Sequence, residues 1–322
     1  MLSSQWQTAR SLAEGQDWLL SADQAMASGL LPTEIASALR SGYVRSLYTG
    51  VYLVDPDLVT ELSRRQWHRA ALLAHGEDAC LVGWSAVRAA GGEGLPAVDP
   101  TVDIVVLGTG ARHRRLSRTG LPRSTPLDSP AIIVRQWPVA AGEVETVDGL
   151  RVRAPGLSVI DAALLLDRPH ALSLLDWSLR TGVHSAESLE RVLLTIRRRP
   201  GAVHVREMAA LADGRAASPL ESRVRLACID GGVPPDELQY PVVNEAGIVM
   251  GYGDLAWLRR RRPLIGEADG TEPHSETRAL FHDRRRANNF VVQACDIVRF
   301  TWADAMRPVY IQQVVRSALR AG

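Results

Sequence analysis

Two short helix patterns followed at once by a tight hairpin pattern occupy residues 17–54, and this succession narrows the fold more than any other feature. The first helix begins at a capping box that opens with Ser21. The second begins at Pro32, a residue favoured in the first turn of a helix. Residues 43–48 and 51–54 then alternate in polarity around a Thr-Gly turn. Together these patterns predict a winged helix-turn-helix.

This layout has a chemical consequence, because the second helix of such a pair can place its N-terminal residues in the major groove of DNA. We therefore expect Thr33 and Arg40 of the second helix to face DNA, and Arg45 of the hairpin to contact phosphates. Short helix pairs also occur in many globular proteins, and this segment has few basic residues. The pattern by itself leaves DNA binding open.

The rest of the chain mixes strand and helix patterns, which predicts a fold of the α/β (α+β) class. We expect a winged helix at 1–76, an α/β middle domain at 77–215 and a second α/β domain at 216–322. The last boundary rests on a new helix start at Ser218, where a cap residue, a proline and a glutamate stand in order. Strands are expected at 102–107, 131–134, 150–153, 239–243 and 297–302, a hairpin at 248–268, and helices at 58–75, 158–166, 171–180, 188–197, 201–218, 218–229, 276–292 and 309–319.

Three carboxylates cluster on the hairpin predicted for residues 248–268. If the hairpin is symmetric about its four-arginine turn, Asp254 stands directly opposite Glu267, and Asp269 shares the face of Glu267. Carboxylates this close repel one another unless a cation lies between them, and Mg²⁺ prefers oxygen ligands. We therefore predict Asp254 and Glu267 as Mg²⁺ ligands that would activate a water molecule for attack on a phosphoryl group. The alternative is a solvated sheet face whose carboxylates pair with arginines.

Other polar residues near these carboxylates have two interpretations each. Glu221 could add a further acid from the preceding helix, although its Ser-Pro-Leu-Glu sequence is also a good helix cap. His274 and the arginines that follow it could hold a scissile phosphate, or they could be surface charge. Arginines in the hairpin turn fit contact with a phosphate backbone. The basic residues assigned to DNA on these grounds are Arg260, Arg261, Arg284 and Arg285.

The composition restricts the chemistry further, because all 37 basic residues are arginine. A mechanism that requires a lysine, whether a Schiff base, a phosphate-loop lysine or a nuclease lysine, is therefore excluded. No apolar run reaches the ~18–20 residues of a membrane span, and the N-terminus lacks the apolar segment of a secretory signal. The three cysteines are widely spaced and form no C-x-x-C motif. We expect a cytoplasmic protein with no membrane partner and no structural zinc.

Two known families resemble this chain. The sequence from Trp18-Leu19-Leu20-Ser21 to Tyr48-Thr49-Gly50, with Trp84-Ser85-Ala86 and residues 152–161, resembles the AbiEi-family antitoxins of type IV toxin–antitoxin systems, which begin with a winged helix. The last hundred residues resemble a domain related to very-short-patch-repair endonucleases, of the PD-(D/E)XK fold. The matching segments there are 218–221, 253–257, 267–270, 282–286 and 298–304.

The resemblance implies roles for individual residues. Asp254 and Glu267 would be metal ligands, Glu221 an auxiliary acid, and Asp269 would occupy the place of the family's lysine. Relatives often carry a lysine at the position of Pro273, whereas this chain has no lysine to offer. DNA and a cognate toxin protein are the implied partners, and a palindromic operator is compatible with a homodimer.

Two functions therefore stay open. The first is a DNA-binding regulator or antitoxin whose nuclease-like domain is inactive. The alternative is a Mg²⁺-dependent DNA endonuclease that uses Asp254, Glu267 and Asp269, with Glu221 and His274 in support. A third interpretation is capture of a toxin without any contact to DNA.

Overall fold

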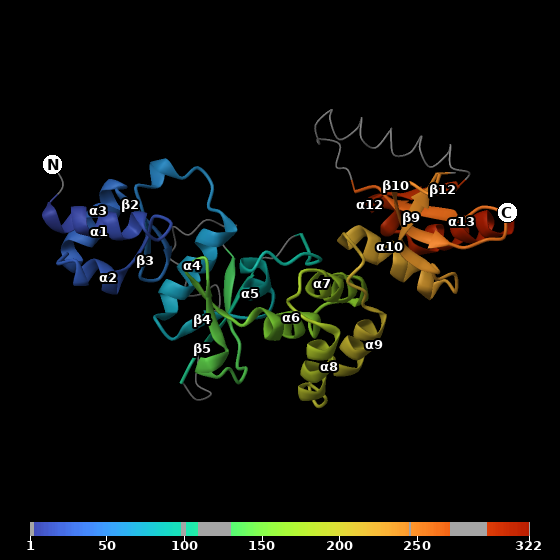
Figure 1. Cartoon of the computed structure of the whole chain (residues 1–322). Coiled ribbons are helices and arrows are strands. Elements are labelled where there is room, and N and C mark those ends of the chain that lie inside the picture. The colour runs from blue at the N-terminus through green and yellow to red at the C-terminus, as the bar shows by residue number, and fades with distance from the viewer. Residues whose placement is uncertain (1–2, 98–100, 109–129, 245, 271–294, 322) are drawn as a thin grey trace. The chain divides into compact units, whose positions relative to one another are not determined.

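The computed structural model describes residues 3–97, 101–108, 130–244, 246–270 and 295–321. It is a mixed α/β structure, which confirms the predicted fold class, and its described residues form three β-sheets (Figure 1). The chain groups into two compact units, one of Met1–Gly91 and Pro96–Ala162, the other of Gly92–Leu95 and Ala163–Gly322. The division into three domains stays a prediction. None of the described helices is both long and apolar enough to cross a lipid bilayer.

The first unit begins with a three-stranded sheet, in the order β1-β3-β2, and three helices. Ser21 caps α2, because its hydroxyl accepts the Gln24 N–H at 3.1 Å while the Gln24 side chain accepts the Ser21 N–H at 3.0 Å. The predicted capping box is thereby confirmed. Gly42, with a φ of 79°, ends α3 in the left-handed conformation. The elements are α1 (Ser4–Glu14), β1 (Leu19–Ser21), α2 (Ala22–Ala27), α3 (Pro32–Ser41), β2 (Val44–Tyr48) and β3 (Val51–Val54).

A five-stranded sheet in the order β6-β5-β4-β8-β7 forms the rest of the first unit. Leu47 of β2, Ala70 of α4 and Ile104 of β5 belong to one buried core, so the small sheet and the larger one pack together. The helix predicted at 58–75 begins only at Arg64, because Ser63 caps it. The elements are η1 (Pro56–Leu58), α4 (Arg64–His75), β4 (Ala79–Leu81), α5 (Gly83–Ala89), β5 (Thr101–Val106), β6 (Ala131–Val134), η3 (Ala141–Glu143), β7 (Val144–Val147), β8 (Leu150–Arg153) and α6 (Pro155–Ala163).

The second unit places helices beside a four-stranded sheet in the order β12-β11-β10-β9. β11 and β12 are parallel, and the other neighbours are antiparallel. Val224 of α10, Trp257 of β10 and Phe300 of β12 share the main core, while Ala256 and Ile265 belong to a smaller core. The elements are α7 (Arg168–Arg180), α8 (Ala186–Thr195), α9 (Ala202–Leu211), α10 (Pro219–Asp230), β9 (Glu237–Val243), β10 (Val249–Trp257), β11 (Leu264–Ala268), β12 (Asp296–Phe300), α12 (Trp302–Ala305) and α13 (Pro308–Ala321).

The register of the β10–β11 hairpin agrees with the prediction. Leu255 pairs with Gly266, which makes the hairpin symmetric about the middle of the arginine turn. Asp254 and Glu267 are the neighbours of this last described pair on their own strands. The helix pattern at 276–292 lies outside the described residues.

Candidate functional site

The outer face of α3 is the first candidate surface. Thr33, Ser37 and Arg40 are exposed and follow one another at spacings of four and three residues, which places them on one face of the helix. Ile35 and Ala38 are buried in a core that α3 shares with α1, α2 and the three-stranded sheet. Burial of these apolar residues turns the polar row toward solvent.

Local interactions hold α3 in place from its two ends. The Leu31 N–H donates to the Glu34 carboxylate at 2.8 Å, so the acid of the first turn satisfies an N–H at the helix start. Gly42 closes the last turn, with its N–H bonded to the Leu39 carbonyl. The positive charge of Arg40 lies in that last turn, where the helix dipole favours a cation.

Arg45, the predicted phosphate contact, lies on β2 opposite Leu53 of β3. It is half-buried, and its Nε atom is enclosed by protein. Less of this side chain reaches solvent than the sequence suggests. Arg40 is the more exposed of the two basic residues assigned to DNA in this region.

A second candidate site forms where the start of α10 meets the C-terminal sheet. Glu221, in the first turn of α10, is only 6% exposed. Its Oε2 atom accepts hydrogen bonds from the Ala217 N–H at 2.8 Å and from the Gln239 side-chain amide at 3.0 Å. Ser218 caps the helix by accepting the Glu221 N–H at 3.2 Å. Glu221 therefore lies in a true helix cap and also reaches the sheet.

Asp254 lies beside the point where the described pairing of β10 with β11 ends, at Leu255 and Gly266. The Ala268 N–H of β11 donates to Asp254 Oδ2 at 2.8 Å, so a side chain takes a backbone donor of the neighbouring strand. The Asp254 carboxylate is half-buried, and the Oε1 atom of Glu267 is enclosed by protein. Both acids thus lie on the two central strands of this sheet and are partly covered by protein.

The carboxylates of Glu221 and Asp254 act on each other. Burial raises the pKa of the Glu221 carboxyl above its ordinary value, and the negative charge of Asp254 raises it further. Hydrogen bonds from Ala217, Ser218 and Gln239 act in the opposite direction without cancelling the rise. The acids of α10 and β10 therefore form one electrostatically coupled site.

Gln239 completes this cluster, although sequence reasoning did not select it. Its φ of 51° is positive, which is uncommon for a residue other than glycine. The unusual backbone breaks the alternation of β9, since Leu238 packs in the main core and Tyr240 packs in the smaller one. A polar residue in a strand pattern normally indicates a solvent-facing position, so no signal in the sequence marks this contact.

The predicted Mg²⁺ site is only partly assembled. Across the described part of the chain, no group of three or more His, Cys, Asp or Glu side chains is placed to hold a metal ion. Asp254 and Glu267 adjoin the last described pair of the hairpin, Leu255 and Gly266, and stay the predicted ligand pair. Asp269 follows at the end of β11, where its N–H donates to the Phe300 carbonyl at 2.8 Å. Three predicted site residues lie outside the described residues: His274, Arg284 and Arg285.

The arginine turn of the hairpin is separated from the carboxylates. Three paired positions lie between the turn and Asp254, and Arg259, the first arginine of the turn, is five residues from Asp254, about 17 Å along an extended strand. Arg259 is used in folding, because its guanidinium donates to the Ala318 carbonyl at 3.0 Å. Arg260 and Arg261 are exposed. These two residues are therefore available to a partner, but not as neighbours of the acids.

Two proteins of Mycobacterium tuberculosis are similar to this chain over most of its length. They are uncharacterized protein Rv2248 and, from a second strain, uncharacterized protein MT2308. Each is 31% identical to this chain over 250 residues, which cover 76% of this chain and 80% of the mycobacterial protein. No protein-family model matches the chain.

Proposed function

The chain belongs to the same family as the mycobacterial proteins Rv2248 and MT2308, and we propose that it is a DNA-binding regulator whose winged helix holds operator DNA. The observation that carries this proposal is the solvent-facing row of Thr33, Ser37 and Arg40 on α3. In helix-turn-helix proteins the second helix of the pair enters the major groove. Hydroxyl groups and a guanidinium on that helix can bond base edges and phosphates.

The order of elements supports the same proposal. A helix, a strand, two helices and a two-stranded hairpin follow in the chain, and the hairpin strands pair with the first strand as β1-β3-β2. The hairpin is therefore held next to the helix pair, as the wing must be to reach phosphates beside the groove. We further propose a regulator of the antitoxin type, with a cognate toxin protein as partner and a homodimer on palindromic sites.

Selection from random duplex DNA with the full-length protein tests DNA binding directly. We expect enrichment of one sequence, and fluorescence anisotropy should show that this duplex binds much more tightly than a scrambled one at the same salt concentration. Arg40→Ala should weaken binding to the selected duplex roughly tenfold, because a guanidinium contact is lost. Arg198→Ala, which removes an exposed arginine of the second unit, serves as the matched control. Failure to enrich any sequence would contradict the proposal.

The coupled acids favour a second candidate function, a Mg²⁺-dependent DNA endonuclease. Asp254 and Glu267 would hold the metal, whose chemical contribution is to lower the pKa of a bound water. Nicking of supercoiled plasmid in Mg²⁺ or Mn²⁺ would support this function if Asp254→Asn abolished it. Glu190→Gln, which changes an exposed acid in α8, should leave any nicking unaltered. If the protein binds DNA but does not nick it, only the regulator function stays supported.

A further inference from the structure

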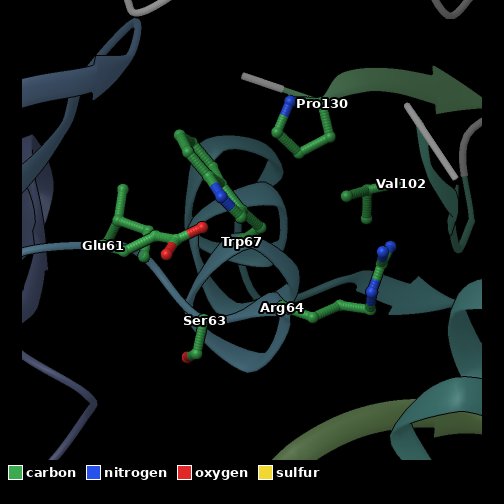
Figure 2. Close-up of a pocket in the computed structure, with 7 residues that line it drawn as sticks. Glu61, Ser63, Arg64, Trp67, Val102 and Pro130 are labelled. Carbon is green, nitrogen blue, oxygen red and sulfur yellow. The ribbon is translucent and has the colours of Figure 1, made fainter. Parts of the chain in front are cut away.

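A pocket of about 480 Å³ lies beside the first turn of α4 in the first unit (Figure 2). Its lining mixes the charged residues Glu61 and Arg64 with the apolar residues Leu62, Trp67 and Val102. A mixed lining of this kind is ordinary for a protein surface and singles out no class of ligand. The β9–β10 hairpin of the second unit differs from it, because the hairpin exposes apolar side chains with almost no charge among them.

The β9–β10 hairpin is apolar on both of its faces near its turn. Val242 of β9 is only 2% exposed and packs in the smaller core with Ala256 and Ile265. Pro241 and Val243, the neighbours of Val242 along the strand, are exposed, because side chains alternate between the two faces of a strand. An antiparallel sheet with one buried face commonly carries polar side chains on the other. Here the exposed face is apolar as well.

The register of this hairpin brings the exposed apolar side chains together. Val249 of β10 is paired with Val243 of β9, and directly paired residues point to the same face. Val243 is 47% exposed and Val249 is 46% exposed. Pro241, Val243 and Val249 therefore form one surface, which we call the β9–β10 face. Ile248, in the turn just before Val249, is 60% exposed and adds apolar surface at the tip of the hairpin.

The stretch that forms this face has an unusually low charge. Residues 238–253 contain one charged residue, Glu245, whereas 23% of the whole chain is charged. Glu245 lies outside the described residues. The stretch contains no arginine, so it has no side chain that would neutralise the phosphates of a nucleic acid. An exposed apolar surface without charge favours a partner surface of the same kind.

The position of β9 restricts how a partner can meet this face. β9 is the outer strand of the sheet in the order β12-β11-β10-β9 (Figure 1). Pro241 has no N–H group to donate, so a strand added along β9 would lack a hydrogen bond in its middle. Contact through side chains is therefore favoured over strand addition. A second copy of this chain carries a matching face, and a two-fold contact places the face on itself without opposing like charges.

We propose that two copies of the chain associate through the β9–β10 face in a two-fold symmetric dimer, with Val243 and Val249 of one copy packed against those of the other. The proposal assigns the surface of contact, and only the use of the dimer on palindromic DNA rests on the proposed function. The face is small, and interfaces that bury less than roughly 1,200 Å² in total are weak. We therefore expect a dissociation constant on the order of 10 µM.

Sedimentation equilibrium of the full-length protein without DNA measures this association. Wild type should change from monomer to dimer between about 1 and 100 µM. Val243→Asp should weaken association roughly tenfold or more, because it places an unpaired charge in the contact. Val203→Asp, the same change at a 63% exposed position of α9, is the matched control and should associate like wild type. Val243→Thr keeps a β-branched side chain for the strand and should weaken association roughly fivefold.

A pair of oppositely charged variants tests the two-fold arrangement. A mixture of Val243→Asp with Val243→Arg should associate more tightly than either variant alone, because opposite charges then meet across the contact. A mixture no tighter than its components would overturn the arrangement.

The proposal is also overturned if wild type stays monomeric at about 100 µM, or if Val243→Asp associates as tightly as Val203→Asp. If Val243→Asp does not fold, Val243→Thr decides, and association equal to wild type then overturns the proposal. A monomeric wild type that binds phosphatidylcholine vesicles would assign the face to a lipid surface instead. Because no DNA is present, failure of the winged helix to bind operator would be seen separately.

Discussion

The outer face of α3 and the carboxylate site beneath α10 are built in opposite ways. Thr33 and Arg40 are exposed to solvent on a single helix. Glu221 and Asp254 come from two elements and are at least half-buried. The acids also accept hydrogen bonds from Ala217 and Ala268. Exposed polar groups cost the fold little, while buried charges must be compensated by neighbours. Substitutions at the α3 face should therefore change the free energy of unfolding little, whereas substitutions at the carboxylate site should change it substantially.

The largest expected loss of stability follows from breaking the ion pair that joins α10 to α7. Asp176 of α7 is 1% exposed and accepts two hydrogen bonds from the Arg225 guanidinium of α10, at 2.7 and 2.9 Å. Asp176→Ala leaves that guanidinium buried without its partner, so we expect a loss of about 3–5 kcal/mol in the free energy of unfolding. Urea unfolding measures this loss, and the double change Asp176→Leu with Arg225→Met should restore most of it. A loss of less than about 1 kcal/mol would show that α10 does not depend on the pair.

The first unit should respond to acid through His68 of α4. Burial lowers the pKa of the His68 side chain to about 4, helped by the positive charges of Arg64 and Arg88. The unfolded chain takes up a proton near pH 6.5 and the folded chain does not, so stability is lost as the pH falls from 6.5 toward 4. We expect this loss to reach about 3 kcal/mol in wild type and to be much smaller in His68→Leu. Equal losses in both proteins, measured by chemical unfolding across this pH range, would refute the prediction.

The carboxylate site should respond to pH in the opposite direction. Because the folded-state pKa of Glu221 is raised, its contribution to stability is fully present below the unfolded pKa and is lost as the pH rises through the folded pKa. Glu221→Gln keeps an oxygen acceptor for the Ala217 N–H and carries no charge to repel Asp254. We expect the variant to match wild type at low pH and to exceed it by about 1 kcal/mol near neutral pH. A variant less stable than wild type near neutral pH would show that the ionised acid is required.

The smallest effect on stability is expected at the α3 face. The double change Thr33→Ala with Arg40→Ala removes two exposed side chains, so the free energy of unfolding should change by no more than about 0.5 kcal/mol. Thermal unfolding of the double variant beside wild type measures this directly. A larger loss would mean that the polar row stabilises the fold and is not free to serve a partner.

Local sequence signals accounted for much of the fold. The capping box at Ser21 and the hairpin register across the arginine turn were predicted correctly, because each depends on residues close together in the chain. β4, a buried strand of three residues, and α1 gave no sequence prediction. A strand this short shows no alternation, and α1 buries only Trp6, Ala9 and Ala13 among polar neighbours.

Contacts between residues far apart in the chain could not be predicted from the sequence. The bond from Gln239 to Glu221 depends on a positive φ in β9 and on how α10 packs on the sheet. Tyr48 likewise contacts the Trp67 ring and donates to the Pro130 carbonyl, and these residues are far apart in the chain. The turn arginines were expected beside the acids, and three paired positions separate them instead.

The sequence by itself determined the capping box at Ser21, the hairpin register about the arginine turn and the absence of lysine chemistry. Each of these is a property of composition or of neighbours within a few residues. Only the tertiary structure decided that Glu221 is buried beside Asp254, that Arg45 is half-buried, and that Tyr48 contacts both Trp67 and the Pro130 carbonyl. Burial and charge coupling depend on which distant segments pack together, and this packing is set by the shared cores rather than by any local pattern.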